Sequence, residues 1–194
     1  MTINEIKRFV LKNGDILLIP LTEEKAAIGQ IIYWNIEPKP LLNPLLKIVN
    51  GIYDIKTLDL STVDISNELF PPIATGVRAA IRSGMWKIIG NLPTGSVPYP
   101  TFVSTFYRDD GTARDWWITD GDGSRSVGLK LPNEYKNCEF KVVLNPPDVV
   151  ERIITGKVTF PYGDLIKYNR FTPIANSTLT SKEDKDTFTK NGSI

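Results

Sequence analysis

Residues 101–119 read TFVSTFYRDDGTARDWWIT, and this stretch decides the fold. Its two arms, 101–108 and 112–119, are rich in β-branched and aromatic side chains, which favour strands. Between them, Asp109-Asp110-Gly111 supplies turn residues, because Asp and Gly tolerate the positive φ angles of a tight hairpin. The stretch therefore predicts two antiparallel strands joined by a short turn.

The same pattern extends in both directions from this hairpin. Asp120-Gly121-Asp122-Gly123 predicts a second turn, which leads into a strand at 124–129. Toward the N-terminus, Asn13-Gly14 between two apolar runs predicts another hairpin. Pro71-Pro72 predicts a break in the chain, since proline cannot donate to a strand ladder. The other predicted strands are 16–19, 25–36, 45–55 with an interruption at Asn50-Gly51, 85–89 and 139–144.

Two short helices are predicted between these strands. Residues 74–83 carry apolar side chains at helical spacing, with Thr75 as a capping residue and Gly84 as the stop. Residues 145–156 begin with Asn145, which is expected to accept hydrogen bonds from the free amides of the first turn, and end at Gly156. A further helical turn is predicted at 61–64.

These elements indicate an α+β fold that is mainly antiparallel β, a small meander or barrel-like sheet with two or three short helices. The chain has 194 residues, of which 41% are hydrophobic and 23% charged, enough for one core without disulfides or a structural metal. We expect one strand-rich domain at 1–171. Residues 172–194 are dominated by Ser, Thr, Lys and Asp, and predict a mobile tail.

The composition narrows the classes of function. The chain contains no histidine, which removes the commonest general base and metal ligand and excludes His-dependent triads. Cys138 is the single cysteine, so neither an intramolecular disulfide nor a thiolate cluster is expected. The net charge of +1 lacks the basic excess of a dedicated nucleic-acid binder. With no signal peptide and no membrane span in the sequence, we expect a cytoplasmic protein that binds another macromolecule and needs no cofactor.

Five acids gather between residues 109 and 122: Asp109, Asp110, Asp115, Asp120 and Asp122. The run from Asp120 to Ser124 resembles the start of a calcium loop, but an EF-hand needs Gly at its sixth position and Glu at its twelfth. Those positions hold Arg125 and Leu131. The spacing is that of hairpin ends, so the acids are predicted to be solvated turn residues rather than metal ligands or paired catalytic carboxylates.

Two aromatic pairs, Trp116-Trp117 and Tyr33-Trp34, raise a question about a binding surface. Adjacent residues of a strand point to opposite faces of the sheet. One indole of Trp116-Trp117 therefore faces the core. The other is either covered by another element or lies on a binding surface, where tryptophan is enriched at hot spots.

Several stretches taken together resemble the immunity protein 26 family of bacterial polymorphic toxin systems. They are NGDILLIPL at 13–21, AIGQII at 27–32, GIYD at 51–54, GMWKIIGN at 84–91 and WWI at 116–118. The resemblance covers roughly residues 12–130. It implies an antidote without catalytic activity that binds a cognate toxin domain in the producing cell. Most of the matching positions are apolar, glycine or turn residues. The resemblance therefore implies a structural framework and assigns no catalytic residues.

The leading hypothesis is therefore an inhibitor that binds a toxin protein through loops or a sheet face. The expected toxin-binding residues are the hairpin-end acids and one aromatic anchor: Asp109, Asp110, Trp117, Asp120 and Asp122. An apolar centre ringed by acids would suit a basic toxin surface.

Two other hypotheses stay open. In a small β-barrel reader of single-stranded nucleic acid or peptide, Tyr33, Trp34 and Trp117 would stack on bases, although the weak charge balance argues against it. In a hydrolase, carboxylates from the 109–122 region would supply acid and base, although the absence of histidine disfavours this. No membrane partner is expected, and the sequence predicts no oligomeric state.

Overall fold

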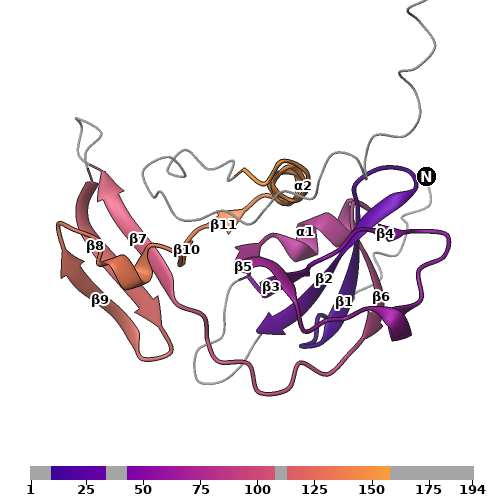
Figure 1. Cartoon of the computed structure of the whole chain (residues 1–194), viewed down its shortest axis with the longest axis horizontal. Helices are drawn as coiled ribbons and strands as arrows, with labels where there is room; N and C mark the ends of the chain where they lie inside the picture. The colour runs from indigo at the N-terminus through magenta and orange to yellow at the C-terminus, as the bar shows by residue number, and fades with distance from the viewer. Residues whose placement is uncertain (1–9, 34–42, 108–112, 158–194) are drawn as a thin grey trace, which may run out of the picture.

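The computed structural model describes residues 10–33, 43–107 and 113–157 of the chain. The strands in this part form two sheets that lie side by side (Figure 1). The large sheet has the order β11-β5-β3-β2-β1-β6, with β4 paired to β2, and the small sheet has the order β10-β7-β8-β9. All pairings are antiparallel except those of β10 with β7 and β11 with β5. The prediction of a mainly antiparallel α+β fold is confirmed.

The elements follow one another along the chain in a simple order. The first half contains β1 (Asp15–Pro20), β2 (Lys25–Tyr33), β3 (Leu45–Val49), β4 (Tyr53–Asp54), η1 (Leu60–Thr62), β5 (Glu68–Thr75), α1 (Val77–Arg82) and β6 (Lys87–Asn91). The second half contains β7 (Phe102–Tyr107), β8 (Ala113–Asp120), β9 (Gly123–Gly128), η2 (Asn133–Tyr135), β10 (Glu139–Phe140), β11 (Val143–Leu144) and α2 (Pro146–Thr155). No described helix is long and apolar enough to cross a membrane.

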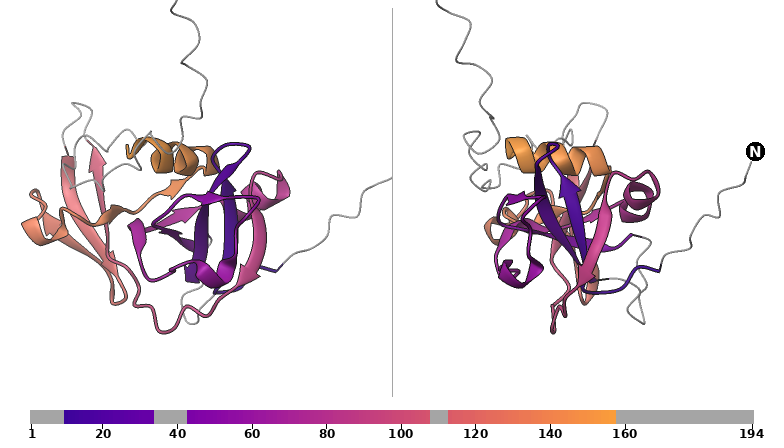
Figure 2. Two further views of the ribbon diagram at one scale, coloured as in Figure 1. Left: turned by 45° about the vertical axis from the view of Figure 1, so that its right-hand side comes forward. Right: turned by 90° about the vertical axis from the view of Figure 1, so that its right-hand side faces the viewer.

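The large sheet is covered on both faces. On one face, α1 and α2 pack against the main core, which includes Leu17, Ile31 and Ile48. On the other face, Ile16 and Ile28 pack against the segment around η1. Figure 2 shows α2 lying along the large sheet, next to the small one. Since both faces are buried, the strands read as nearly continuous apolar runs.

The predicted strand at 139–144 divides between the two sheets. Its first residues form β10 and pair with β7, whereas its last residues form β11 and pair with β5. Arg152 of α2 reaches this junction and forms a buried ion pair with Glu139 of β10, in which Nη1 lies 3.0 Å from Oε2. The guanidinium also lies over the ring of Phe70 in β5, 4.0 Å from its centroid. These contacts join the small sheet to the large one.

Three local predictions were wrong in an instructive way. Pro71-Pro72 does not break the chain but lies inside β5, at a bulge where two residues oppose Lys47 of β3, so neither proline interrupts the ladder. Thr75 does not cap α1; it ends β5, and its hydroxyl donates to the backbone oxygen of Leu144. Asn145 precedes α2 as expected, but its side chain donates to the carboxylate of Asp148 and caps no amide.

The Asn-Gly-Asp and Gly-Asn stretches meet at one corner of the large sheet. The buried carboxylate of Asp15 accepts hydrogen bonds from the backbone N–H of Lys12 at 2.8 Å and from the side-chain amide of Asn91 at 2.9 Å. Gly14 has a φ of +88° and donates to the backbone oxygen of Ile31, while its own oxygen accepts from Leu92. We call this site the framework corner, because its hydrogen bonds from Asn91 to Asp15 and from Leu92 to Gly14 hold β1 against β6.

Replacing Gly14 by Ala is expected to lower the free energy of unfolding by about 2–3 kcal/mol, measured by urea denaturation. A Cβ at this position would lie 2.4 Å from the backbone oxygen of Leu92, in addition to the strain of the positive φ. Gly84→Ala is the matched control, because φ there is +77° and no atom lies within 4 Å of the new Cβ. Equal losses in the two variants would contradict the steric argument.

Candidate functional site

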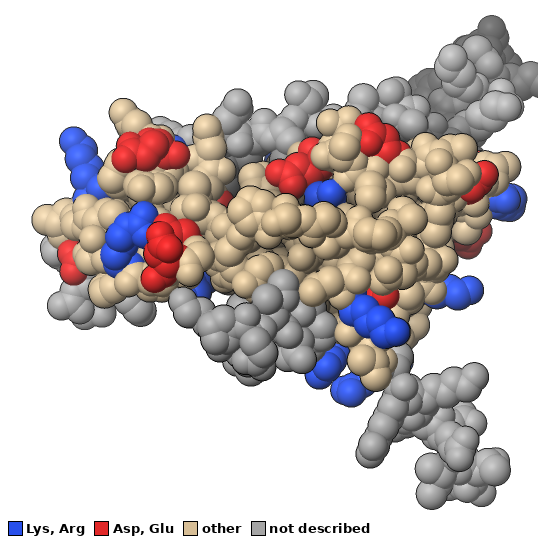
Figure 3. All heavy atoms as spheres, turned by 90° about the horizontal axis from the view of Figure 1, so that it is seen from below, with Lys and Arg blue, Asp and Glu red and all other residues tan. Residues whose placement is uncertain are grey.

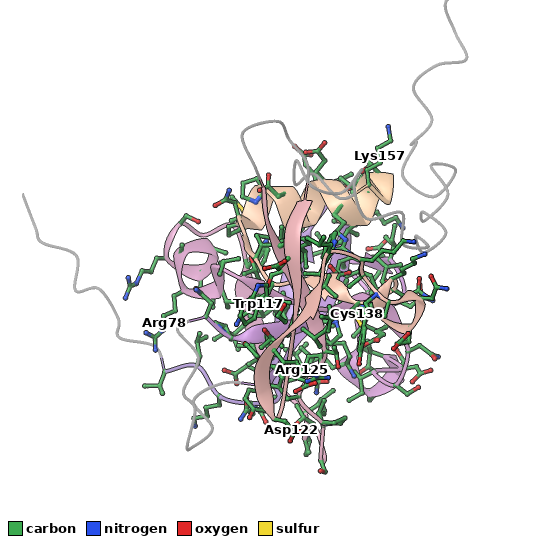
Figure 4. The ribbon with its side chains drawn as sticks, turned by 90° about the vertical axis from the view of Figure 1, so that its left-hand side faces the viewer. Arg78, Trp117, Asp122, Arg125, Cys138 and Lys157 are labelled. Atoms are coloured by element: carbon green, nitrogen blue, oxygen red, sulfur yellow. The ribbon has the colours of Figure 1, made fainter. Side chains whose placement is uncertain are left out.

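Trp117 lies in β8, a central strand of the small sheet with β7 on one side and β9 on the other. Its neighbour Trp116 points to the opposite face, where it is buried and packs edge-on against Phe140 with 6.5 Å between the ring centroids. That covered face also carries Val103 and Ile118, which pack under residues 131–140. Figure 4 shows Trp117 and Cys138 on opposite sides of the sheet. The expected alternation holds, and Trp117 is the indole that does not face the core of the small sheet.

The Trp117 face of the small sheet consists of Trp117 and the residues that share its side in the strand register. Ser104 of β7 lies opposite Trp117 on one side, and Ser126 of β9 lies opposite it on the other. Thr119 and Ser124 form the next pair and share a hydrogen bond of 2.8 Å between their hydroxyls. Both flanking side chains are small, and the indole is half-buried. Phe102 of β7 lies opposite Thr119 but is buried, and Lys141 donates to the Thr119 hydroxyl at 3.3 Å. Trp117, between its two serines, is therefore the ring of this face that is suited to anchoring a partner.

The β8–β9 turn carries the acids Asp120 and Asp122. The Arg125 guanidinium donates to the Asp120 carboxylate at 2.6 Å and approaches the Tyr135 hydroxyl at 3.5 Å. The backbone N–H of Asp122 donates to the same carboxylate at 3.1 Å. Asp122 itself is exposed (Figure 4). Asp120 is therefore part of an ion pair, and Asp122 is the solvated acid of the turn.

This end of the molecule has mixed rather than uniform charge. Viewed from below, acidic and basic side chains lie side by side over the small sheet (Figure 3). The hydrogen bond from Arg125 lowers the pKa of Asp120 below its ordinary value, and the N–H of Asp122 adds to this effect. The carboxylate thus stays charged at neutral pH while its guanidinium partner offsets its field.

Replacing Arg125 by Ala is expected to raise the pKa of Asp120 toward its ordinary value, because the largest stabilising contact of the charged form is lost. An NMR titration of the carboxyl carbon measures this pKa directly. Since the folded-state pKa lies below the unfolded one, the contact stabilises the fold above the unfolded pKa and is lost as pH falls through the folded pKa. Lys136→Ala, an exposed cation at the end of η2, is the control and should leave the titration unchanged. An unshifted midpoint in the Arg125 variant would refute this assignment.

The structure does not place the predicted binding residues on one face. Trp117 and Asp120 both lie in the second half of β8, but Asp120 pairs with Arg125 on the side of Ile118, opposite to Trp117, and Asp122 follows in the turn. Asp109 and Asp110 lie outside the described residues. The described part of the predicted surface is therefore the Trp117 face and the β8–β9 turn beside it.

The other predicted aromatic pair, Tyr33-Trp34, is also only partly covered by the described residues. Tyr33 ends β2 and packs edge-on against Tyr99, with 5.1 Å between the ring centroids. Tyr99 in turn lies against Phe102 of β7, and burial raises the pKa of the Tyr99 phenol. Tyr33 thus belongs to the packing between the two sheets. Trp34 lies outside the described residues.

Within the described ranges, no group of three or more Cys, Asp and Glu side chains is placed to hold a metal ion. Burial raises the pKa of the Cys138 thiol, and the nearby Glu139 raises it further. A protonated, half-buried thiol is a poor nucleophile. The acid of the framework corner, Asp15, is occupied by backbone and amide donors. The Asp15 carboxylate therefore serves to hold the start of β1 against β6.

Sequence reasoning missed the residues that give the Trp117 face its shape. Ser104 and Ser126 were not singled out, because their importance depends on which residues lie opposite Trp117 in neighbouring strands. Arg125 was noted only because it occupies the position at which an EF-hand calcium loop needs glycine. A signal was present in Ser124-Arg125-Ser126, a polar run with small residues at alternate positions in a predicted strand that follows the Trp pair.

Comparison with known proteins adds one match. A protein-family model described as Immunity protein 26 matches residues 12–117, more than half of the chain. Neither the curated proteins nor the solved structures yield a match. The matched region contains β1 to β6, β7 and β8 as far as Trp117. The resemblance inferred from the sequence is confirmed.

Proposed function

We propose a function from one premise: this chain belongs to the immunity protein 26 family. On our proposal it binds a cognate bacterial toxin domain in the cytoplasm of the producing cell and neutralises it by stoichiometric binding, without catalysis. The observation that carries this is the family match itself. The framework corner at Gly14 and Asp15 supports it, because the matched residues there are engaged in backbone contacts rather than exposed for chemistry.

The toxin-binding surface, on this proposal, is the Trp117 face together with the exposed Asp122 of the β8–β9 turn. The family match ends at Trp117, so β9, η2 and β10 come from the part of the chain that the family model does not cover. Discrimination between partners is a difference of affinities and needs features particular to one binder. A surface built partly outside the shared framework is suited to fit one toxin.

A titration of toxin activity tests the proposed function. The probe is the toxin domain encoded by the neighbouring gene, assayed at a fixed concentration against increasing amounts of this chain. We expect activity to fall linearly and reach zero at a simple molar ratio, with a complex of that stoichiometry in size-exclusion chromatography. A toxin domain from an unrelated system should stay active. Full activity in the presence of excess chain would refute the proposal, and loss of activity at far substoichiometric amounts would indicate an enzyme.

One observation also favours a second candidate function, a reader of single-stranded nucleic acid or peptide. Trp117 stands between two serines on a sheet face, which is an arrangement suited to stacking on a base. Binding of an oligonucleotide that weakens steeply with salt would support this candidate. Because the net charge is only +1, we expect no such binding at physiological salt.

A further inference from the structure

We propose that the toxin adds a strand to the free edge of β9. This inference rests on the proposed function and specifies how the partner is held. The occupant is an extended segment of the toxin, bound mainly by backbone hydrogen bonds and secondarily by Trp117.

The edge itself is the first observation. β9 is the last strand of the small sheet, and its outer side has no pairing partner among the described residues. In an antiparallel pair, successive residues alternate between hydrogen bonding to the neighbour and pointing their N–H and C=O groups outward. The side chains of Ser124, Arg125 and Ser126 are all exposed. A row of unpaired backbone groups beside small side chains is a template for another strand.

The other strand ends are less suitable. β10 and β11 are two residues long and lie at the junction of the two sheets, where Arg152 and Glu139 are buried. β6 is the outer strand of the large sheet, but its last residue, Asn91, is tied by its side chain to the framework corner. β9 alone among these pairs with β8, where Ser126 lies opposite Trp117, and it also lies outside the family match.

The length of the usable edge is set by a bulge. The β8–β9 register shifts between Trp116 and Trp117, so that Val127 is the extra residue, and Gly128 has a φ of +87°. A bulge bends the strand and ends regular pairing. Continuous pairing therefore runs over residues 123–126, with Gly123 at a φ of +125° at its turn end, and this length fits a short extended segment of the partner.

The side chains next to this ladder specify the chemistry of the partner segment. Ser124 and Ser126 lie on the Trp117 face, and because they are small the indole is able to reach across β9 toward an added strand, about 10 Å away or two strand spacings. An apolar side chain of the partner fits there. On the opposite face, Nη1 of Arg125 donates to Asp120, and the remaining donors of the guanidinium favour an acceptor such as an acid directly across from it. The partner segment is thus extended, free of proline, and carries an apolar and an acidic residue on its two faces.

A second copy of this chain is a poorer occupant of the same edge. Two-fold antiparallel pairing of β9 with itself must place residues of the same face opposite one another. Over 123–126, such pairing sets Arg125 opposite its own copy or one step diagonal to it. Like charges in these positions destabilise the pair. The charge pattern therefore favours a different chain as partner.

Residue-resolved amide hydrogen exchange, comparing the free chain with its complex with the neighbouring toxin domain, tests the inference. We expect alternate amides within 123–126 to exchange at least tenfold more slowly in the complex, while the amides of β7 change little. A complex that forms without protection in β9 would overturn the inference and leave the proposed function intact. Protection in the toxin-free chain that rises with its own concentration would identify a second copy as occupant and overturn it too. If no complex forms, both the proposed function and the inference fail.

Discussion

Replacing Glu139 by Gln is expected to lower the free energy of unfolding by about 3–5 kcal/mol. The side chains of Arg152 and Glu139 are only 3% and 6% exposed, and two hydrogen bonds join them. Gln keeps the size of Glu but removes the charge that offsets the guanidinium. The variant therefore leaves a buried cation between α2, β10 and the ring of Phe70, without its anionic partner. Urea denaturation of the purified chain measures the loss.

Two further variants separate this explanation from a general sensitivity to substitution. Glu24→Gln removes the acid of the Lys56–Glu24 pair, whose side chains are 75% and 62% exposed, and should change stability by less than about 0.5 kcal/mol. The double variant Arg152→Met with Glu139→Leu should recover most of the loss, because apolar residues of similar volume often replace a buried pair without cost. If Glu139→Gln proved as harmless as Glu24→Gln, the pair would not hold the sheets together.

The position of this ion pair has a consequence for binding. Glu139 lies in β10, which pairs with β7, and β7 pairs with β8, the strand that carries Trp117. Arg152 belongs to α2, which packs on the core of the large sheet. The orientation of the Trp117 face relative to the large sheet therefore depends on a contact that does not involve Trp117 itself. A variant that weakens the pair is expected to weaken toxin binding as well, without touching the partner.

Local patterns predicted much of the small sheet. The hairpin at 101–119 appears as β7 and β8, and the Asp-Gly turn leads into β9 as expected. The helix that ends at Gly156 is also present, with a left-handed φ of 70° at that glycine. These features depend on residues close in sequence, whose preferred φ angles and periodicity carry the information. They could therefore be read without knowing the tertiary contacts.

The features that the sequence did not predict depend on contacts between residues that are far apart in the chain. The segment 139–144 has one strand-like pattern, but its two ends pair with β7 and β5, more than 30 residues away in the chain. The ion pair between Glu139 and Arg152 joins a strand to a helix, and no spacing rule predicts it. At the site, alternation predicted that Trp116 and Trp117 diverge, but only the packing of Phe140 on Trp116 decides which is buried.

Replacing Trp117 by Ala is expected to weaken toxin binding by about 3 kcal/mol, on the order of 100-fold in Kd, as measured by calorimetric titration with the neighbouring toxin domain. The indole is only half-buried, whereas Phe102 on the same face is buried, and the flanking residues at 104 and 126 are small serines. Trp117→Phe should retain part of the affinity, since an aromatic ring remains to fill the partner's pocket.

The controls for this variant come from the same chain. Val143 in β11 is 50% exposed and apolar but lies on the other sheet, so Val143→Ala should leave the affinity unchanged. Trp116→Ala, in contrast, removes a buried ring and should lower the stability of the small sheet before it affects binding. Trp117 itself belongs to none of the four buried clusters in the described residues, so its loss should change the melting temperature little. Unchanged affinity in a folded Trp117→Ala variant would mean that the toxin binds elsewhere on this molecule.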